Sequence, residues 1–275
     1  MAEILLLLSL ILFALSVAPT GFRGIFAAGG WIFLAVVFFS MSFHYIFENE
    51  FVYPAAAVIS VPLLFITVKG CLKNDRTALN ISSVAAIAFL IYAAVALWEP
   101  LATWLIETQV ENTVSALLAI GHPASVSQWD TILSNGYIVV ITLSCTPVVG
   151  TAIMLGVAMG VESSKFQKII ACVFTIATLA VLNLSRLVFV VVAYSEQWFP
   201  YFLDIASNGY PGFESFYWAH NVIGRIIFTI LGIVITGGGL AIVVPDVRKF
   251  YSDIITFYYS GAVEIKSTFF RKLKL

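Results

Sequence analysis

Seven long apolar runs dominate the chain, and short polar segments separate them. Most of the runs are close to 20 residues, the length of a helix that crosses the hydrocarbon core of a bilayer, and only the first is clearly shorter. The runs cover residues 4–18, 25–46, 52–69, 79–98, 137–160, 168–194 and 222–244. The pattern predicts an all-α fold, a polytopic transmembrane helical bundle of about seven spans.

Composition supports this class and excludes a soluble enzyme. Hydrophobic residues make up 61% of the chain and charged residues 11%, whereas roughly a quarter of a soluble domain is charged. We therefore expect one transmembrane domain over residues 1–245 and a tail over 246–275. The tail mixes aromatic and basic residues, as in a helix that lies on the cytoplasmic membrane surface. Outside it there is no basic block of the nucleic-acid-binding type, so no nucleic acid partner is expected.

Positive charge falls on alternate loops, which predicts the orientation of the spans. The loops after the first, third and fifth spans and the tail carry Lys and Arg, whereas the remaining loops carry only acidic charges. The basic residues outside the spans or at their ends are Arg23, Lys69, Lys73, Arg76, Lys165, Lys168, Arg248, Lys249, Lys266, Arg271, Lys272 and Lys274. By the positive-inside rule the N-terminus lies outside and the C-terminus in the cytoplasm.

Two arginines, Arg186 and Arg225, lie inside predicted spans. A guanidinium in the hydrocarbon region costs roughly 3 kcal/mol or more, so each is a functional hypothesis that requires a partner. The predicted orientation places both toward the outer face, together with Cys145. Structural interpretations stay open here: an intramembrane Arg can bind a lipid phosphate or hold a helix pair, and cysteine is often simply buried.

Cys145 with the two arginines is the arrangement that nucleophilic catalysis requires. A thiol becomes a strong nucleophile when it ionises, and a neighbouring cation such as Arg186 favours the thiolate. A second fixed cation, Arg225, is placed to stabilise an oxyanion. The cysteines form no CxxC motif and no histidine lies at metal-ligand spacing, so neither a metal nor a cofactor is expected.

Polar residues at helical spacing support the two arginines. Asn183 precedes Arg186 by three residues and Asn221 precedes Arg225 by four, so each pair shares a helix face and is predicted to be hydrogen-bonded. His220 lies at the outer mouth of the last span and is a candidate acid or base. The angle of about 100° between adjacent helical residues argues against both His220 and Asn221 reaching the thiol.

The ordered motifs on three consecutive helices resemble a known family. They are Ser144-Cys145-Thr146, Asn183-Leu-Ser-Arg186 and His220-Asn221-Val-Ile-Gly-Arg225. Over residues 80–245 the chain resembles the archaeosortase/exosortase family, and within it the archaeosortase A group. Exosortases have His at the third position and the archaeal group has Arg, which favours Arg225 over His220. One departure is Pro147, where the family often has Gly.

The resemblance implies a membrane-embedded cysteine transpeptidase. Its substrates would be exported proteins that end in a sorting signal made of a Pro-Gly-Phe-type motif, a hydrophobic helix and a basic cluster. Cys145 would cleave near the motif through a thioester, Arg186 and Arg225 would stabilise the thiolate and the oxyanion, and an amine-bearing membrane lipid would accept the acyl group. The implied location is the cell membrane, with the active site of this catalytic domain toward the outer face.

Other functions compatible with the same residues are a processing protease that hydrolyses the thioester, a lipid-modifying enzyme, and a non-enzymatic transporter. In the transporter, Arg186 and Arg225 would bind an anion or lipid near mid-membrane. Replacement of Cys145 separates these classes, because a transporter does not need the thiol.

Overall fold

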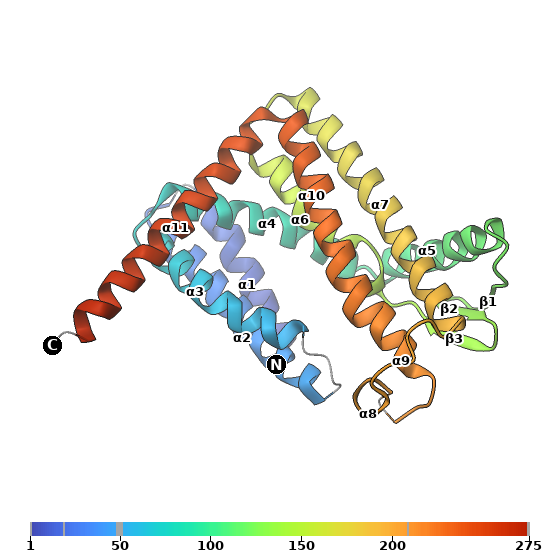
Figure 1. Ribbon diagram of the computed structural model, residues 1–275. Helices are drawn as coiled ribbons and strands as arrows, with labels where there is room; N and C mark the ends of the chain where they lie inside the picture. The colour runs from blue at the N-terminus through green and yellow to red at the C-terminus, as the bar shows by residue number, and fades with distance from the viewer. Residues whose placement is uncertain (1, 19, 48–51, 208, 274–275) are drawn as a thin grey trace. The chain divides into compact units, whose positions relative to one another are not determined.

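The computed structural model describes residues 2–18, 20–47, 52–207 and 209–273 and is mostly helical (Figure 1). Within these residues, five helical stretches are long and apolar enough to cross a membrane, which agrees with the predicted polytopic membrane class. They are Arg23–Ile46 in α2 (Arg23–Phe47), α3 (Val52–Leu72), α4 (Arg76–Ala96), α7 (Lys165–Ser195), and the stretch Phe213–Val243 that ends in α10 (Arg225–Val243).

Two of the seven predicted spans form helices that are shorter than the rest. The first, α1 (Ala2–Val17), has 16 residues. The fifth predicted span, 137–160, is helical only in α6 (Val148–Gly160), whose 13 residues extend about 20 Å, less than the hydrocarbon thickness of about 30 Å. Its first residues form a β-strand and a 3₁₀ turn instead. The expected single helix over 137–160 is therefore wrong.

The chain divides into two compact units. Unit 1 comprises Met1–Leu90, Gly156–Lys168 and Val243–Leu275, and unit 2 comprises Ile91–Leu155 and Ile169–Ile242. The motif residues named above all belong to unit 2. The tail belongs to unit 1.

In unit 1, the contacts between α1 and α2 include an aromatic pair and a hydrogen bond from Ser9. The rings of Phe13 and Trp31 meet edge to face with their centroids 5.2 Å apart. The Ser9 hydroxyl donates to the Gly30 carbonyl at 2.9 Å. Trp31 continues the contact to α4, where its indole N–H donates to the Ser82 hydroxyl at 2.9 Å. Small residues at the helix contacts let these apolar helices approach closely.

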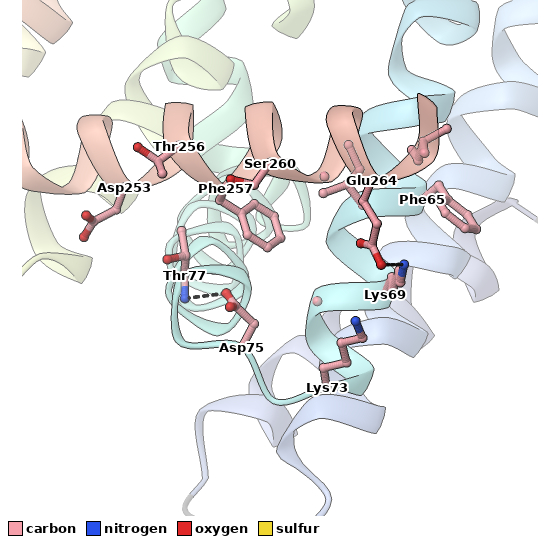
Figure 2. Close-up of a pocket in the computed structure, with 14 residues that line it drawn as sticks. Phe65, Lys69, Lys73, Asp75, Thr77, Asp253, Thr256, Phe257, Ser260 and Glu264 are labelled. Carbon is pink, nitrogen blue, oxygen red and sulfur yellow. Dashed lines mark hydrogen bonds and ion pairs between the residues drawn. The ribbon is translucent and has the colours of Figure 1, made fainter. Parts of the chain in front are cut away.

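The tail forms the predicted helix, α11 (Pro245–Leu273), and packs on α3 (Figure 1). The hydroxyls of Thr67 and Tyr258 are 2.8 Å apart. A pocket of about 400 Å³ lies between the two helices (Figure 2). Figure 2 shows the Lys69–Glu264 ion pair at 2.7 Å on its wall, and Asp75 accepting from the Thr77 N–H at 2.9 Å as the N-terminal cap of α4. These charges serve to dock α11 and to cap α4.

Unit 2 contains a three-stranded antiparallel sheet, which corrects the all-α prediction. The strands are β1 (Ser125–Gln128), β2 (Thr131–Ser134) and β3 (Tyr137–Val140) in that order across the sheet. β2 and β3 are joined by the two-residue turn Asn135-Gly136, with φ of 48° and 84°. Asn-Gly tolerates this left-handed backbone better than other pairs, and it matches the twist of a two-residue hairpin.

The sheet packs with helices into the hydrophobic core of unit 2. One of these helices is α5 (Glu99–Ala119). It contributes one side of the core, the sheet and the following segment contribute another, and α7 completes it. The buried members are Ile106, Val110, Val114, Leu117, Ile132, Val139, Ile141, Cys145, Leu187 and Val191. The predicted nucleophile is thus part of a packed core.

A hydrogen-bond network ties the hairpin to the ends of α5 and α7. The Nε2 atom of His122 lies 2.9 Å from the hydroxyls of both Ser134 and Ser195. Glu196 faces the other ring nitrogen at 3.8 Å and accepts from the Asn135 amide at 2.7 Å. Both serine hydroxyls donate to backbone carbonyls, so Nε2 donates to them and neither serine is activated as a nucleophile. The network is structural and holds β3, and the chain that leaves it, in place.

Candidate active site

Cys145 ends a short 3₁₀ turn, η1 (Leu143–Cys145), between β3 and α6, outside the five candidate spans. Its N–H donates to the Thr142 carbonyl at 2.9 Å, and its side chain is buried, with the residue only 8% exposed. The thiol lies 3.6 Å from the Thr142 hydroxyl. Pro147 fits this backbone, because Thr146 before it is extended and the Pro147 carbonyl accepts a helical bond from Thr151 at 2.9 Å.

His220 lies on an eight-residue π-helix, η2 (Tyr217–Gly224), that precedes α10. Such wide turns are rare and are frequent at functional sites. Gly224 permits this one, since a Cβ there would lie 2.5 Å from the Ala219 carbonyl oxygen. The ring of His220 stacks on Phe216 with the centroids 4.9 Å apart. This stack covers one face of the imidazole.

The two nitrogens of His220 have different partners. Nδ1 lies 2.6 Å from Asn221 Oδ1, which accepts, so Nδ1 carries a proton. Nε2 faces Arg186 Nη2 at 3.3 Å. The His220 ring also lowers the pKa of the Cys145 thiol. The helical angle had argued against both His220 and Asn221 reaching the thiol. In the structure Asn221 contacts the imidazole of His220, and the imidazole lowers the pKa of the thiol.

Asn183 on α7 fixes the backbone of Cys145. Its Nδ2 donates to the Cys145 carbonyl at 3.0 Å and to Oε1 of Gln109 on α5 at 3.0 Å. Asn183, Asn221 and Gln109 are each 8% exposed, so these bonds are shielded from water. Asn183 therefore supports the site through Cys145, and Asn221 supports it through His220.

Five of the six predicted site residues are linked by these contacts: Cys145, Asn183, Arg186, His220 and Asn221. The sixth, Arg225, is half-buried and begins α10 directly after the π-helix, and its oxyanion role stays a prediction. Among the described residues, no group of three or more His, Cys, Asp or Glu is placed to hold a metal ion.

Sequence reasoning missed Gln109. It lies on α5 among the buried positions Ile106, Val110 and Thr113, at the spacing of one helix face. A buried amide on an apolar face requires hydrogen-bond partners, and this irregularity in the pattern is the signal that could have identified it.

The environment of Cys145 favours its thiolate. Burial raises the pKa of the thiol, but hydrogen bonds from His220 and from the backbone and hydroxyl of Thr142, together with the charge of His220, lower the pKa to about 6. At pH 7 a group with this pKa is about ten to one ionised. His220 and Thr142 are the groups that lower this pKa, and the role that the sequence assigned to Arg186 at the thiolate stays a prediction.

Comparison of the chain with protein-family models, curated proteins and solved structures finds no match. The geometry of the site and the motifs that form it are therefore the grounds for a function.

The thiol pKa gives a direct prediction for alkylation. Because only the thiolate reacts, the rate of Cys145 modification by iodoacetamide is expected to fall as the pH drops through about 6 and to be nearly constant above pH 7. Peptide mapping by mass spectrometry resolves Cys145 from Cys71 and Cys172. A rate that still rises steeply between pH 7 and 8.5, as for an ordinary thiol, would show that the His220 contact does not activate Cys145.

Proposed function

We propose that this protein is a membrane cysteine transpeptidase of the archaeosortase/exosortase type. It cleaves C-terminal sorting signals of exported proteins and transfers the new C-terminus to a membrane lipid. The observation that carries the proposal is the setting of Cys145, a buried thiol whose pKa is lowered by the imidazole of His220, which the buried amide of Asn221 orients. The motif order that resembles the family supplies the reaction class.

The first half-reaction forms a thioester. The thiolate of Cys145 attacks the carbonyl carbon next to the Pro-Gly-Phe-type motif, and the carbonyl oxygen becomes an oxyanion. His220 Nε2, which takes the thiol proton, gives it to the amine of the departing C-terminal fragment. The carbon–nitrogen bond breaks and a carbon–sulfur bond remains.

The arginines stabilise charge in this step. Arg186 Nη2, which lies 3.3 Å from His220 Nε2, is assigned to the developing oxyanion. Arg225 is assigned to the same oxygen. In a water-poor site each fixed donor contributes about 3 to 4 kcal/mol to transition-state stabilisation.

The second half-reaction returns the enzyme to its starting state. The amine of a membrane lipid attacks the thioester carbonyl and gives a proton to His220 Nε2, a carbon–nitrogen bond forms, the carbon–sulfur bond breaks, and the departing thiolate is stabilised again by His220. The substrate helix lies in the membrane beside the catalytic helices, with the scissile bond toward the outer face and the basic cluster in the cytoplasm. Exported proteins are the partners in this scheme, and neither metal nor nucleic acid takes part.

The test is to co-express the protein with a reporter that ends in Pro-Gly-Phe, an apolar helix and a basic tail, and to measure the intact mass of the reporter. Loss of the tail together with added lipid mass, with wild type and not with Cys145→Ala, is the expected result. Tail loss without added mass would make the protein a hydrolytic protease. An unchanged reporter would reject the peptidase and favour a transporter that uses Arg186 and Arg225.

A further inference from the structure

Gln109 lies outside every motif that suggested the site, yet it contacts the site directly. Its side chain is buried on α5, and its Oε1 accepts a hydrogen bond from Asn183 Nδ2 at 3.0 Å. The same Nδ2 donates to the Cys145 carbonyl at 3.0 Å. Gln109, Asn183 and Cys145 thus form one hydrogen-bonded series that runs from α5 through α7 to the 3₁₀ turn.

We propose that Gln109 is a positioning residue that orients Asn183 and, through it, holds the Cys145 backbone so that the thiol faces His220. This inference rests on the proposed function for its catalytic consequence. The claim that Gln109 sets the position of the thiol does not depend on the proposed function.

The side-chain amide of Asn183 connects Gln109 to Cys145. An amide nitrogen has two N–H groups, and in this site one is directed to Gln109 and the other to Cys145. The geometry of an amide is planar, so fixing one N–H fixes the direction of the other. Gln109 therefore determines where the second donor points, and Asn183 cannot rotate about its terminal bond without leaving a buried acceptor unpaired.

The position of the thiol depends on the 3₁₀ turn η1. The thiol belongs to the last residue of η1, a turn of only three residues. A turn of this length has few backbone hydrogen bonds of its own. Within it, Cys145 N–H donates to Thr142, while the Cys145 carbonyl is held from outside by Asn183. If that carbonyl is released, the peptide group can rotate and move the thiol relative to the ring of His220.

Gln109→Leu is the variant that tests this series, because leucine has a similar size and no acceptor. The readout is the pH profile of Cys145 alkylation in the full-length protein. We expect the midpoint to move upward by about one pH unit or more, with a roughly tenfold lower rate at pH 6, and processing of the reporter to fall in kcat with little change in KM. Gln109→Glu keeps the acceptor oxygen and is expected to restore the profile.

Thr113→Val is the matched control. Thr113 is fully buried one turn further along α5, and its hydroxyl donates to the Gln109 backbone carbonyl at 2.6 Å. Valine removes this buried hydrogen bond from the same helix without touching Asn183, so its alkylation profile is expected to match that of wild type. A profile shifted equally by Thr113→Val and Gln109→Leu, or unshifted by Gln109→Leu, would overturn the inference.

The alkylation profile needs no substrate, so it separates this inference from the proposed function. If the wild-type protein does not process the reporter but Gln109→Leu still shifts the profile, the positioning role holds and the proposed function fails. If the reporter is processed and Gln109→Leu changes neither rate nor profile, the proposed function holds and the positioning role fails.

Discussion

Replacing Cys145 with alanine is expected to abolish removal of the sorting signal, with a loss of roughly 10³-fold or more in rate. The reason is chemical, because the thioester cannot form without the sulfur, and no neighbouring side chain in the described site is a comparable nucleophile. The measurement is the rate of tail loss from the reporter, followed by mass, with the variant present at the same level in the membrane as the wild type.

Two further variants serve as controls for the loss of activity in Cys145→Ala. Cys145→Ser preserves size and a hydrogen-bonding group, but a hydroxyl does not ionise near neutral pH, so it is expected to be nearly as inactive as alanine. Cys172→Ala changes a cysteine in the first turns of α7 that has no assigned role, and it is expected to retain activity. Full activity of Cys145→Ala would remove the nucleophile from the account.

Replacing His220 with alanine is expected to lower the rate about 10²- to 10⁴-fold at pH 7, the range for loss of a positioned general acid–base. The same change removes a hydrogen bond and a charge that lower the Cys145 pKa, so the alkylation midpoint should rise from about 6 toward that of an ordinary thiol. Part of the lost rate is then expected to return as the pH increases, because a larger fraction of the thiol ionises.

Two variants separate orientation of the His220 ring from stabilisation of the oxyanion: Asn221→Ala and Arg225→Ala. Asn221 fixes the ring and its tautomer, so Asn221→Ala should lower the rate less than His220→Ala and should shift the alkylation midpoint in the same direction. Arg225→Ala should lower the rate without shifting that midpoint, because its assigned role is at the oxyanion. An active His220→Ala combined with an inactive Arg225→Ala would restore the assignment that the motif comparison had favoured.

The membrane class and most of the site were predictable from the sequence. Apolar runs of spanning length form helices in any environment that excludes water, so the positions of α2, α3, α4 and α7 follow from hydropathy. Arg186 was recognised because a guanidinium inside such a run is expensive. Asn183 was recognised because helical periodicity places it on the same face as Arg186.

The sheet was not predicted because hydropathy alone does not distinguish an apolar strand from an apolar helix. β3 and α6 are both apolar and nearly contiguous, so their residues merge into one run of spanning length. Asn135-Gly136 between two short apolar segments is a strong hairpin signal, and it is the local feature that separates the strand from the helix. Once the strand is recognised, Cys145 lies in a turn and not within a span.

The contact of His220 with the thiol was missed because it depends on tertiary structure. The estimate of 100° per residue holds for an α-helix, whereas residues 217–224 form a π-helix with a different angular spacing. Gln109 was missed for a related reason. It comes from α5, which no motif includes, and only the packing of α5 against α7 brings it to Asn183.

The measurement that tests the central claim most directly is the mass of the enzyme itself during turnover. Wild-type protein mixed with reporter and quenched at low pH is expected to carry the acyl part of the reporter on the Cys145 peptide, and neutral hydroxylamine should release it, as for a thioester. Processing of the reporter without this adduct, or an adduct on any other residue, would contradict the assignment of Cys145 as the nucleophile.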